Sequence, residues 1–205
     1  AAWNGVTAGR SLEDATRIEA RGWCEQHLAD SDLIVQEVYG APLLERSRVE
    51  QIHQGRVYPA GSPDARRAFD ARKAWRTVTI PLTVVGTNAV NDSPLAGPPV
   101  SIEVVERAAQ LNAPLYDPRL FAGVDVVITS GAVRGRFEAD PASYPEACAF
   151  YALLDSTADS LAHFISRGGD SGPELPVYRL TDRTRAAIAA HPTLPPLWWV
   201  RAIEA

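Results

Sequence analysis

The chain has 205 residues, of which 46% are hydrophobic and 22% are charged, a composition that excludes a disordered protein and fits one globular domain over 1–205. Its formal net charge of -5 argues against general binding to nucleic acid or to an anionic membrane, because both need a basic surface. The sequence contains neither an apolar run of the ~18 residues that a membrane-spanning helix needs nor a charged and then apolar leader, so we expect a cytoplasmic protein without membrane contact.

The first third of the chain is expected to be mainly helical. A serine followed three residues later by an aspartate is typical of a helix start, which predicts a helix from Ser11 to about Leu28. The apolar segment Ser31–Tyr39 favours a strand, although the same residues could continue a helix. Prolines in the first turn predict two further helices, at Pro42–Gln54 and at Ser62–Trp75.

Strict alternation predicts the next strand. Apolar and polar residues alternate from Thr77 to Val85, as they do on a strand that has one face in the core. Pro81 in this run suggests a sheet edge, since proline has no amide hydrogen to donate. A long loop over 86–99 then leads to a second alternating run from Val100 to Val104.

The most informative stretch of the chain follows. Apolar residues alternate from Val124 to Ile128 and again from Val133 to Phe137, which predicts two short paired strands. Ser130-Gly131 supplies a two-residue turn between them, although one bent strand with a bulge at the glycine fits nearly as well. An apolar stripe at spacings of three and four then predicts a long helix from about Ser143 to Arg167, which paired glycines end.

The chain closes with a strand at Val177–Leu180, a helix that Thr181 caps and that ends before Pro192, and a last strand near Trp198–Ile203. Helices and antiparallel-looking strands are therefore mixed. We predict an α+β fold of one domain, in which a mostly antiparallel sheet is packed on one face by the long helix, with additional N-terminal helices.

One short segment resembles a catalytic signature. The run Gly169-Asp170-Ser171-Gly172-Pro173 is similar to the GDSGGP nucleophile loop of chymotrypsin-like serine proteases, with one glycine missing. The resemblance implies a nucleophilic serine that is assisted by a histidine base and an orienting aspartate. The sequence lacks the histidine segment of that family, and the predicted long helix stands where the family has strands. We therefore interpret the segment as the turn that ends the helix.

A line of polar residues lies on the predicted long helix. Asp155, Asp159 and His163 are spaced by four residues, so two carboxylates and an imidazole share one side of that helix. Such a line could bind a metal ion or pair an acid with a base. We favour a solvated helix face, because a metal site would also need ligands from another element and the sequence indicates none.

The two cysteines suggest no site either. Cys24 lies three residues from His27, with His53 available from the second predicted helix, but structural zinc needs four such ligands and the sequence has one close pair. Cys24 and Cys148 could form a disulfide, although two reduced thiols are the more ordinary interpretation. We expect no metal and no cofactor.

Arginines provide the best small-ligand candidate. Arg72 and Arg76 end the third predicted helix, and Arg134 and Arg136 lie on one of the two short strands. Because guanidinium groups grip carboxylates and phosphates, these four side chains could form an anion pocket if the helix lay near the sheet. The alternative, which we favour, is that acidic neighbours neutralise them as surface pairs.

Trp198 and Trp199 are the candidate partner-binding residues. Adjacent residues on a strand face opposite ways, so the two indoles cannot both enter one core layer. An exposed indole would make the last strand a docking edge for another protein chain or a second copy of this one. The alternative is a helix that covers the second face.

Two functions compete. The first, slightly favoured, is a non-catalytic protein-binding or assembly protein, such as an accessory subunit or inhibitor of a larger partner. The second is a small-molecule enzyme that holds an anionic substrate with the arginines while His53 or Asp125 moves a proton. A pocket lined by at least two of the arginines and a histidine would support the enzyme.

Overall fold

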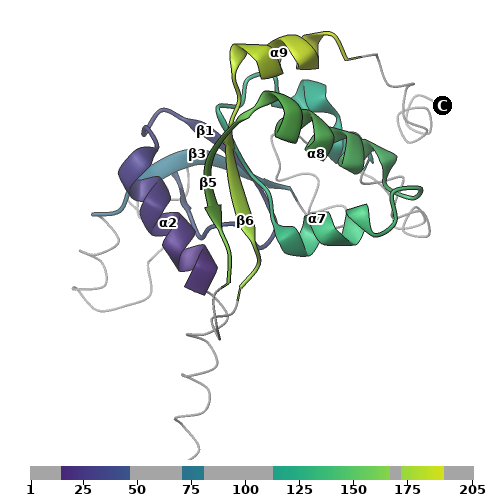
Figure 1. The fold of residues 1–205 in the computed structure, drawn as a ribbon. Helices are drawn as coiled ribbons and strands as arrows, with labels where there is room; N and C mark the ends of the chain where they lie inside the picture. Colours follow the sequence, from purple (N-terminus) through teal and green to yellow (C-terminus); the bar gives the residue numbers. More distant parts are fainter. Residues whose placement is uncertain (1–14, 47–70, 81–112, 167–171, 192–205) are drawn as a thin grey trace, which may run out of the picture.

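The computed structural model describes residues 15–46, 71–80, 113–166 and 172–191. Within these ranges one sheet of six strands lies between two helical layers (Figure 1). The strand order is β2-β3-β1-β4-β6-β5. The strands are β1 (Leu33–Glu37), β2 (Leu44–Glu45), β3 (Ala74–Ile80), β4 (Val126–Ile128), β5 (Asp159–Phe164) and β6 (Leu175–Arg179).

The sheet is mixed, so the expectation of a mostly antiparallel sheet is wrong. β1 pairs in parallel with β3 and β4, and β2 pairs in parallel with β3. β6 is antiparallel to both β4 and β5. The residues of β4 and all but the first of β1 are buried, as is typical of parallel strands covered on both faces. Alternation predicts that a segment is a strand but carries no information about the direction of its neighbours.

The helices divide between the two faces of the sheet (Figure 1). α2 (Ala15–His27) packs on β5 and β6 from one side. The other side is covered by α7 (Gly131–Glu138), α8 (Pro145–Thr157) and α9 (Asp182–Ala189), with two 3-10 turns, η2 (Ala113–Tyr116) and η3 (Pro118–Phe121). None of the helices in the described ranges has the length and apolar character needed to cross a membrane.

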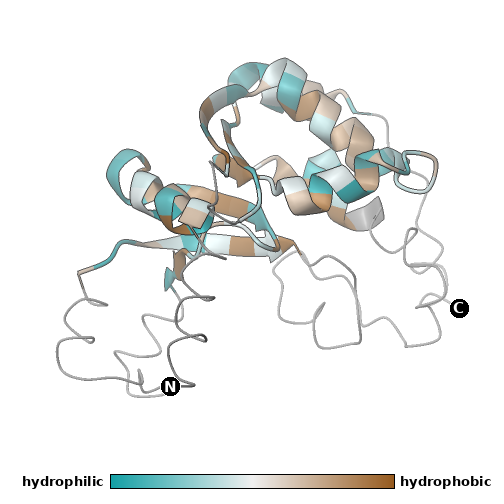
Figure 2. Cartoon of the chain, turned by 60° about the horizontal axis from the view of Figure 1, so that its bottom comes forward, coloured by the Kyte–Doolittle hydropathy of each residue, from teal (hydrophilic) through white to brown (hydrophobic). Residues whose placement is uncertain are grey.

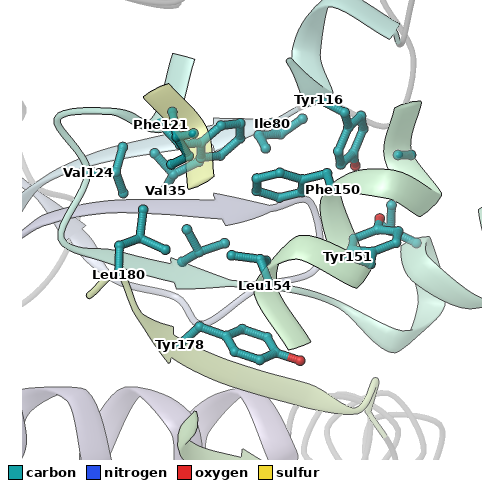
Figure 3. Packing of buried hydrophobic residues seen from close by; sticks show 14 of the residues in the cluster. Val35, Ile80, Tyr116, Phe121, Val124, Phe150, Tyr151, Leu154, Tyr178 and Leu180 are labelled. Carbon is teal, nitrogen blue, oxygen red and sulfur yellow. The ribbon is translucent and has the colours of Figure 1, made fainter. Parts of the chain in front are cut away.

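Each face has its own hydrophobic core. On the α8 side, Phe121 and Phe150 pack with ring centres 4.3 Å apart above Val35 of β1 (Figure 3). On the α2 side, Cys24 and Leu28 contribute to a smaller cluster on the opposite face of the strands. Figure 2 shows hydrophobic residues along the strands between these two layers. Burial of apolar surface on both faces holds the sheet rigid beneath the site described below.

The predicted strand pair and long helix need correction. The first strand is confirmed as β4, but the second is the helix α7, because Val133 and Phe137 are four residues apart and both turn into the same core. The long helix stops at Thr157, and β5 begins at Asp159. Pairing of β5 with β6 overrides the helical spacing of the apolar residues, a long-range contact that a local pattern does not encode.

Other elements agree where they are described. α2, β1, β6 and α9 confirm the predicted helix, strand, strand and capped helix, and the Thr181 side chain accepts the hydrogen bond of the Thr184 amide as expected of a cap. Two predicted helices are contradicted where β2 and the start of β3 replace them, since short strands beside β1 complete the sheet there. The run 100–104, the strand near 198–203 and residues 47–54 and 62–70 of those two predicted helices lie outside the described residues.

Candidate functional site

The site lies at the carboxyl ends of β1 and β4. From the end of β1 the chain runs to β2 and β3 on one side, whereas from the end of β4 it runs through α7 and α8 to β5 and β6 on the other side. Neighbouring parallel strands whose connections leave in opposite directions form a topological switch point, where open α/β sheets bind their ligands. The polar residues of this edge are therefore the ones to inspect.

A buried carboxyl group occupies this position. Glu37, the last residue of β1, is only 2% exposed. Its Oε1 atom accepts hydrogen bonds from the hydroxyls of Tyr116 at 2.6 Å and Tyr151 at 2.5 Å, and its Oε2 atom accepts one from the Ser130 amide at 2.6 Å. Figure 3 shows the two tyrosine hydroxyls turned toward one another from η2 and α8. The carboxyl group thus ties β1 to three other segments.

Burial governs the protonation of this cluster. It raises the pKa of Glu37, and the three donated hydrogen bonds work against that rise. Burial is also the main reason why the pKa of Tyr116 and the pKa of Tyr151 are raised, and the charge of Glu37 adds to it. Both tyrosines therefore stay protonated and remain donors to Glu37.

A polar groove of about 370 Å³ opens beside this cluster, between α7 and the strands β5 and β6. Its size is that of a small-molecule site. The lining side chains come from three elements and from the residue before β6. The lining residues are Gly131, Arg134, Gly135 and Glu138 of α7, Ser160 and His163 of β5, and Glu174, Pro176 and Tyr178 at β6.

Arg134 is the central cation of the groove wall. Its guanidinium group bonds Glu138 at 2.7 Å and Asp155 at 2.6 Å. It also lies 5.1 Å from the centre of the Tyr151 ring. The hydrogen bond from Arg134 is the main reason why the pKa of Asp155 is lowered, and burial raises the pKa of Tyr178, which donates to Asp155, to about 12. Arg134 thus links the groove to the buried Glu37 through one aromatic ring.

The opposite wall carries an imidazole held by a carboxylate. His163 Nε2 lies 2.5 Å from Glu174 Oε1. The backbone oxygen of Glu174 in turn accepts a hydrogen bond from the Gly131 amide at 2.7 Å. A Cβ atom at Gly131 would lie only 2.8 Å from the Glu174 Cβ, so glycine is needed for this close approach. An imidazole oriented in this way can give or accept a proton at the groove.

Three buried polar atoms at this edge make no hydrogen bond within the described part of the chain. They are Oε1 of Gln36, the residue before the end of β1, and Oγ1 of Thr129 and Oγ of Ser130, which follow β4. Buried polar atoms in proteins are nearly always bonded, so unpartnered ones mark positions of functional interest. Thr129 and Ser130 lie close to Glu37, whose carboxyl group accepts the hydrogen bond of the Ser130 amide.

The four candidate arginines are not brought together. Arg72 pairs with Glu25 of α2 at 3.2 Å, on the side of the sheet opposite to α7. Arg76 and Arg136 are exposed on β3 and α7, and Arg134 alone of the four lines the groove. The groove therefore combines one candidate arginine with one histidine, His163, rather than with the candidate His53, which lies outside the described residues.

Asp125, the other candidate proton carrier, lies just before β4, at the end of the strand opposite to the groove. Its carboxylate accepts a hydrogen bond from the Leu33 amide at 2.9 Å and pairs with Arg185 at 3.4 Å. These contacts give it a structural role in holding β1 against β4. Trp198 and Trp199 lie outside the described residues, so the docking edge stays a prediction.

The potential metal ligands have other surroundings. Asp155 is on α8, whereas Asp159 and His163 are on β5, so the expectation that they share one helix face is wrong. Cys24 lies on the buried side of α2, where burial raises its pKa to about 12, and it forms no disulfide with Cys148. His27 stacks on Trp23 with ring centres 4.6 Å apart. No cluster of three metal-ligating side chains occurs among the residues described.

Searches among protein-family models, curated proteins and solved structures find no match to this chain. The site is therefore defined by its own geometry.

Sequence reasoning missed Glu37, Tyr116, Tyr151 and Glu174. A signal for Glu37 exists, because a carboxylate that ends an apolar run is unusual in a buried strand and requires partners. The tyrosines give no such signal, since they are 79 and 114 residues away from Glu37 along the chain.

Proposed function

We propose that this chain binds a small polar molecule in the groove between α7 and the strands β5 and β6. The observation that carries the proposal is the position of that groove. It lies between α7, the helix that follows the carboxyl end of β4, and the strands β5 and β6 on the side of β4 away from β1, and its size and mostly polar walls fit a small-molecule site. The rigid sheet beneath it fits a site whose geometry must be held constant.

The groove also carries the elements of proton transfer. His163, held by Glu174, replaces His53 and Asp125 as the group that would move a proton to or from a bound molecule. Arg134, held by Asp155 and Glu138, forms the wall of the groove on the α7 side. The groove holds one of the four candidate arginines rather than two, so the criterion set from the sequence is not met. We favour the small-molecule function because a histidine, an arginine and two carboxylates line one groove. The docking function depends on Trp198 and Trp199 and is tested separately by the mass of the native chain and of W198A and W199A in solution.

A substitution that fills the groove tests the proposal. An added Cβ at Gly135 meets nothing within 4 Å, so Gly135→Leu extends a large side chain from an open position of the groove wall. Gly22→Leu is the matched control, because it makes the same change in α2 and also meets open space. A metabolite library screened by ligand-induced thermal stabilisation should give compounds that bind the native chain and Gly22→Leu.

The same compounds should not bind Gly135→Leu. A compound that stabilises the native chain and Gly135→Leu equally would show that the groove is not the site.

A further inference from the structure

We infer that the groove selects a small organic cation, a molecule with at least one aliphatic ammonium or guanidinium group, rather than an anion. The inference rests on the proposed function of the same groove and adds the chemical class of its ligand. It departs from the anionic substrate that the arginine content of the sequence suggests.

The charge of the groove wall favours a cation. Glu138 and Glu174 line the groove, and Asp155 contacts its wall through Arg134 and Tyr178. Three carboxylates thus stand against one guanidinium group. His163 contributes a positive charge only when it is protonated. The wall is therefore net negative, which attracts a cation and repels phosphate or carboxylate compounds.

Arg134 is already paired with acidic side chains. Its Nε atom donates to Glu138 and its Nη2 atom donates to Asp155, so both edges of the guanidinium group already hold a carboxylate. The hydrogen bond from Arg134 is the main reason why the pKa of Asp155 is lowered, so the negative charge of Asp155 persists into acid. An incoming anion would have to displace one of these partners, which costs a charge-assisted hydrogen bond. Arg134 thus acts as part of the wall and does not serve as an anion receptor.

Two carboxylates and a hydroxyl in the groove lining can accept hydrogen bonds. Glu138 and Glu174 each use Oε1 in their internal pairs, and their side chains are 45% and 51% exposed. Each carboxylate can accept further hydrogen bonds through Oε2, and Ser160 offers a hydroxyl from β5. An ammonium group has three donors and no acceptor, so it complements two carboxylates and a hydroxyl.

The test is a calorimetric titration with named probes. Putrescine, spermidine and agmatine serve as cations, glucose as a neutral polyol and inorganic phosphate as an anion. At least one amine should bind the native chain with saturation at one site, and phosphate should not. Glu174→Gln and Glu138→Gln should each weaken that binding by about two- to fivefold, as expected for a half-exposed ion pair. Gly135→Leu should abolish it.

The chain as a whole carries a charge of -5, so diffuse attraction of amines needs its own control. Glu19→Gln removes one exposed carboxylate from α2, on the opposite face of the sheet, and should leave the affinity unchanged. An equal loss in Glu19→Gln and Glu174→Gln, or amine binding that survives in Gly135→Leu, would overturn the inference.

Phosphate or glucose that binds and is lost in Gly135→Leu, with no amine bound, would overturn the ligand class and leave the groove as the site. No binding of any probe would overturn the ligand class as well, and the library screen with Gly135→Leu would then decide the function independently.

Discussion

The Tyr151 hydroxyl donates a hydrogen bond to the buried carboxyl group of Glu37 at 2.5 Å. The ring that carries this hydroxyl lies 5.1 Å from the guanidinium group of Arg134. One side chain on α8 therefore contacts both the end of the central strand and the wall of the groove. Substitutions at Glu37 and Tyr151 should for this reason affect both stability and the groove.

Removing the Glu37 carboxyl group should be costly. Glu37→Ala leaves two tyrosine hydroxyls and the Ser130 amide without their acceptor, and we expect a loss of about 3 kcal/mol or more in the free energy of unfolding. Tyr151→Phe removes only one donor and should cost about 1 kcal/mol. Urea denaturation measures both values. Glu19→Ala on the exposed side of α2 should stay within about 0.5 kcal/mol, and a similar small loss for Glu37→Ala would contradict a role for the cluster.

The Arg134–Asp155 pair should make stability depend on pH. The folded pKa of Asp155 is lowered, so its stabilising contribution is present above the unfolded pKa of about 4 and is lost as the pH falls through the folded pKa. Asp155→Asn should therefore be less stable than the native chain at pH 7, and the difference should shrink on acidification. Denaturation curves from pH 7 to pH 3 would show this, and a constant difference would exclude the pair as its source.

The contribution of Glu37 to stability should depend on pH in the opposite direction. Burial raises its folded pKa above the unfolded value, so its contribution to stability is greatest below the unfolded pKa of about 4.3 and decreases as the pH rises through the folded pKa. Glu37→Gln lacks this group and should show no such decrease over that window. The two chains are compared by the slope of the free energy of unfolding against pH. The absolute free energy is not used, because replacing the carboxyl group with an amide changes it at every pH. Parallel slopes for the two chains would contradict the raised pKa.

Two glycines of α7 should respond differently to the same change. Gly131→Ala places a Cβ 2.8 Å from the Glu174 Cβ, and we expect a loss of about 1–3 kcal/mol from the forced shift. Gly135→Ala meets nothing within 4 Å and should gain about 0.5–1 kcal/mol, because alanine favours a helix. Thermal unfolding of the two variants separates these outcomes. If both substitutions changed stability equally, the close contact between Gly131 and Glu174 would be contradicted.

The two thiols should differ in reactivity. Cys24 is buried and its pKa is raised to about 12 by burial, whereas Cys148 is only half-buried on α8. A thiol reagent should label Cys148 in the native chain and reach Cys24 only in denaturant, as peptide mass spectrometry after brief labelling can show. Labelling of Cys24 first would mean that α2 opens from the sheet.

The sequence predicts the elements better than their arrangement. Thr181 and Thr184 form the cap of α9 through local contacts, so the start of that helix could be foreseen. The helix at Gly131 could not, because residues four apart satisfy the spacing of a strand as well as that of a helix. The local spacing also predicts a helix over β5, because the pairing of β5 with β6 depends on residues that are farther along the chain.

The candidate site was less predictable still. Arg134 and His163 were both singled out, but as parts of different constellations, and the groove joins them only because α7 and β5 flank β6. The carboxylates that neutralise Arg134 come from its own helix and from α8. The positions of the arginines in the sequence therefore suggest an anion site, whereas the carboxylates around Arg134 favour a cation.

A single residue, Ala158, separates the end of α8 from the start of β5. Tyr151 on this continuous segment reaches the interior, and His163, twelve positions later, faces the groove. Because no loop separates the helix from the strand, we expect a bound molecule that contacts His163 to perturb the segment that also carries Tyr151. A change in the ultraviolet absorbance of tyrosine on binding would show this effect.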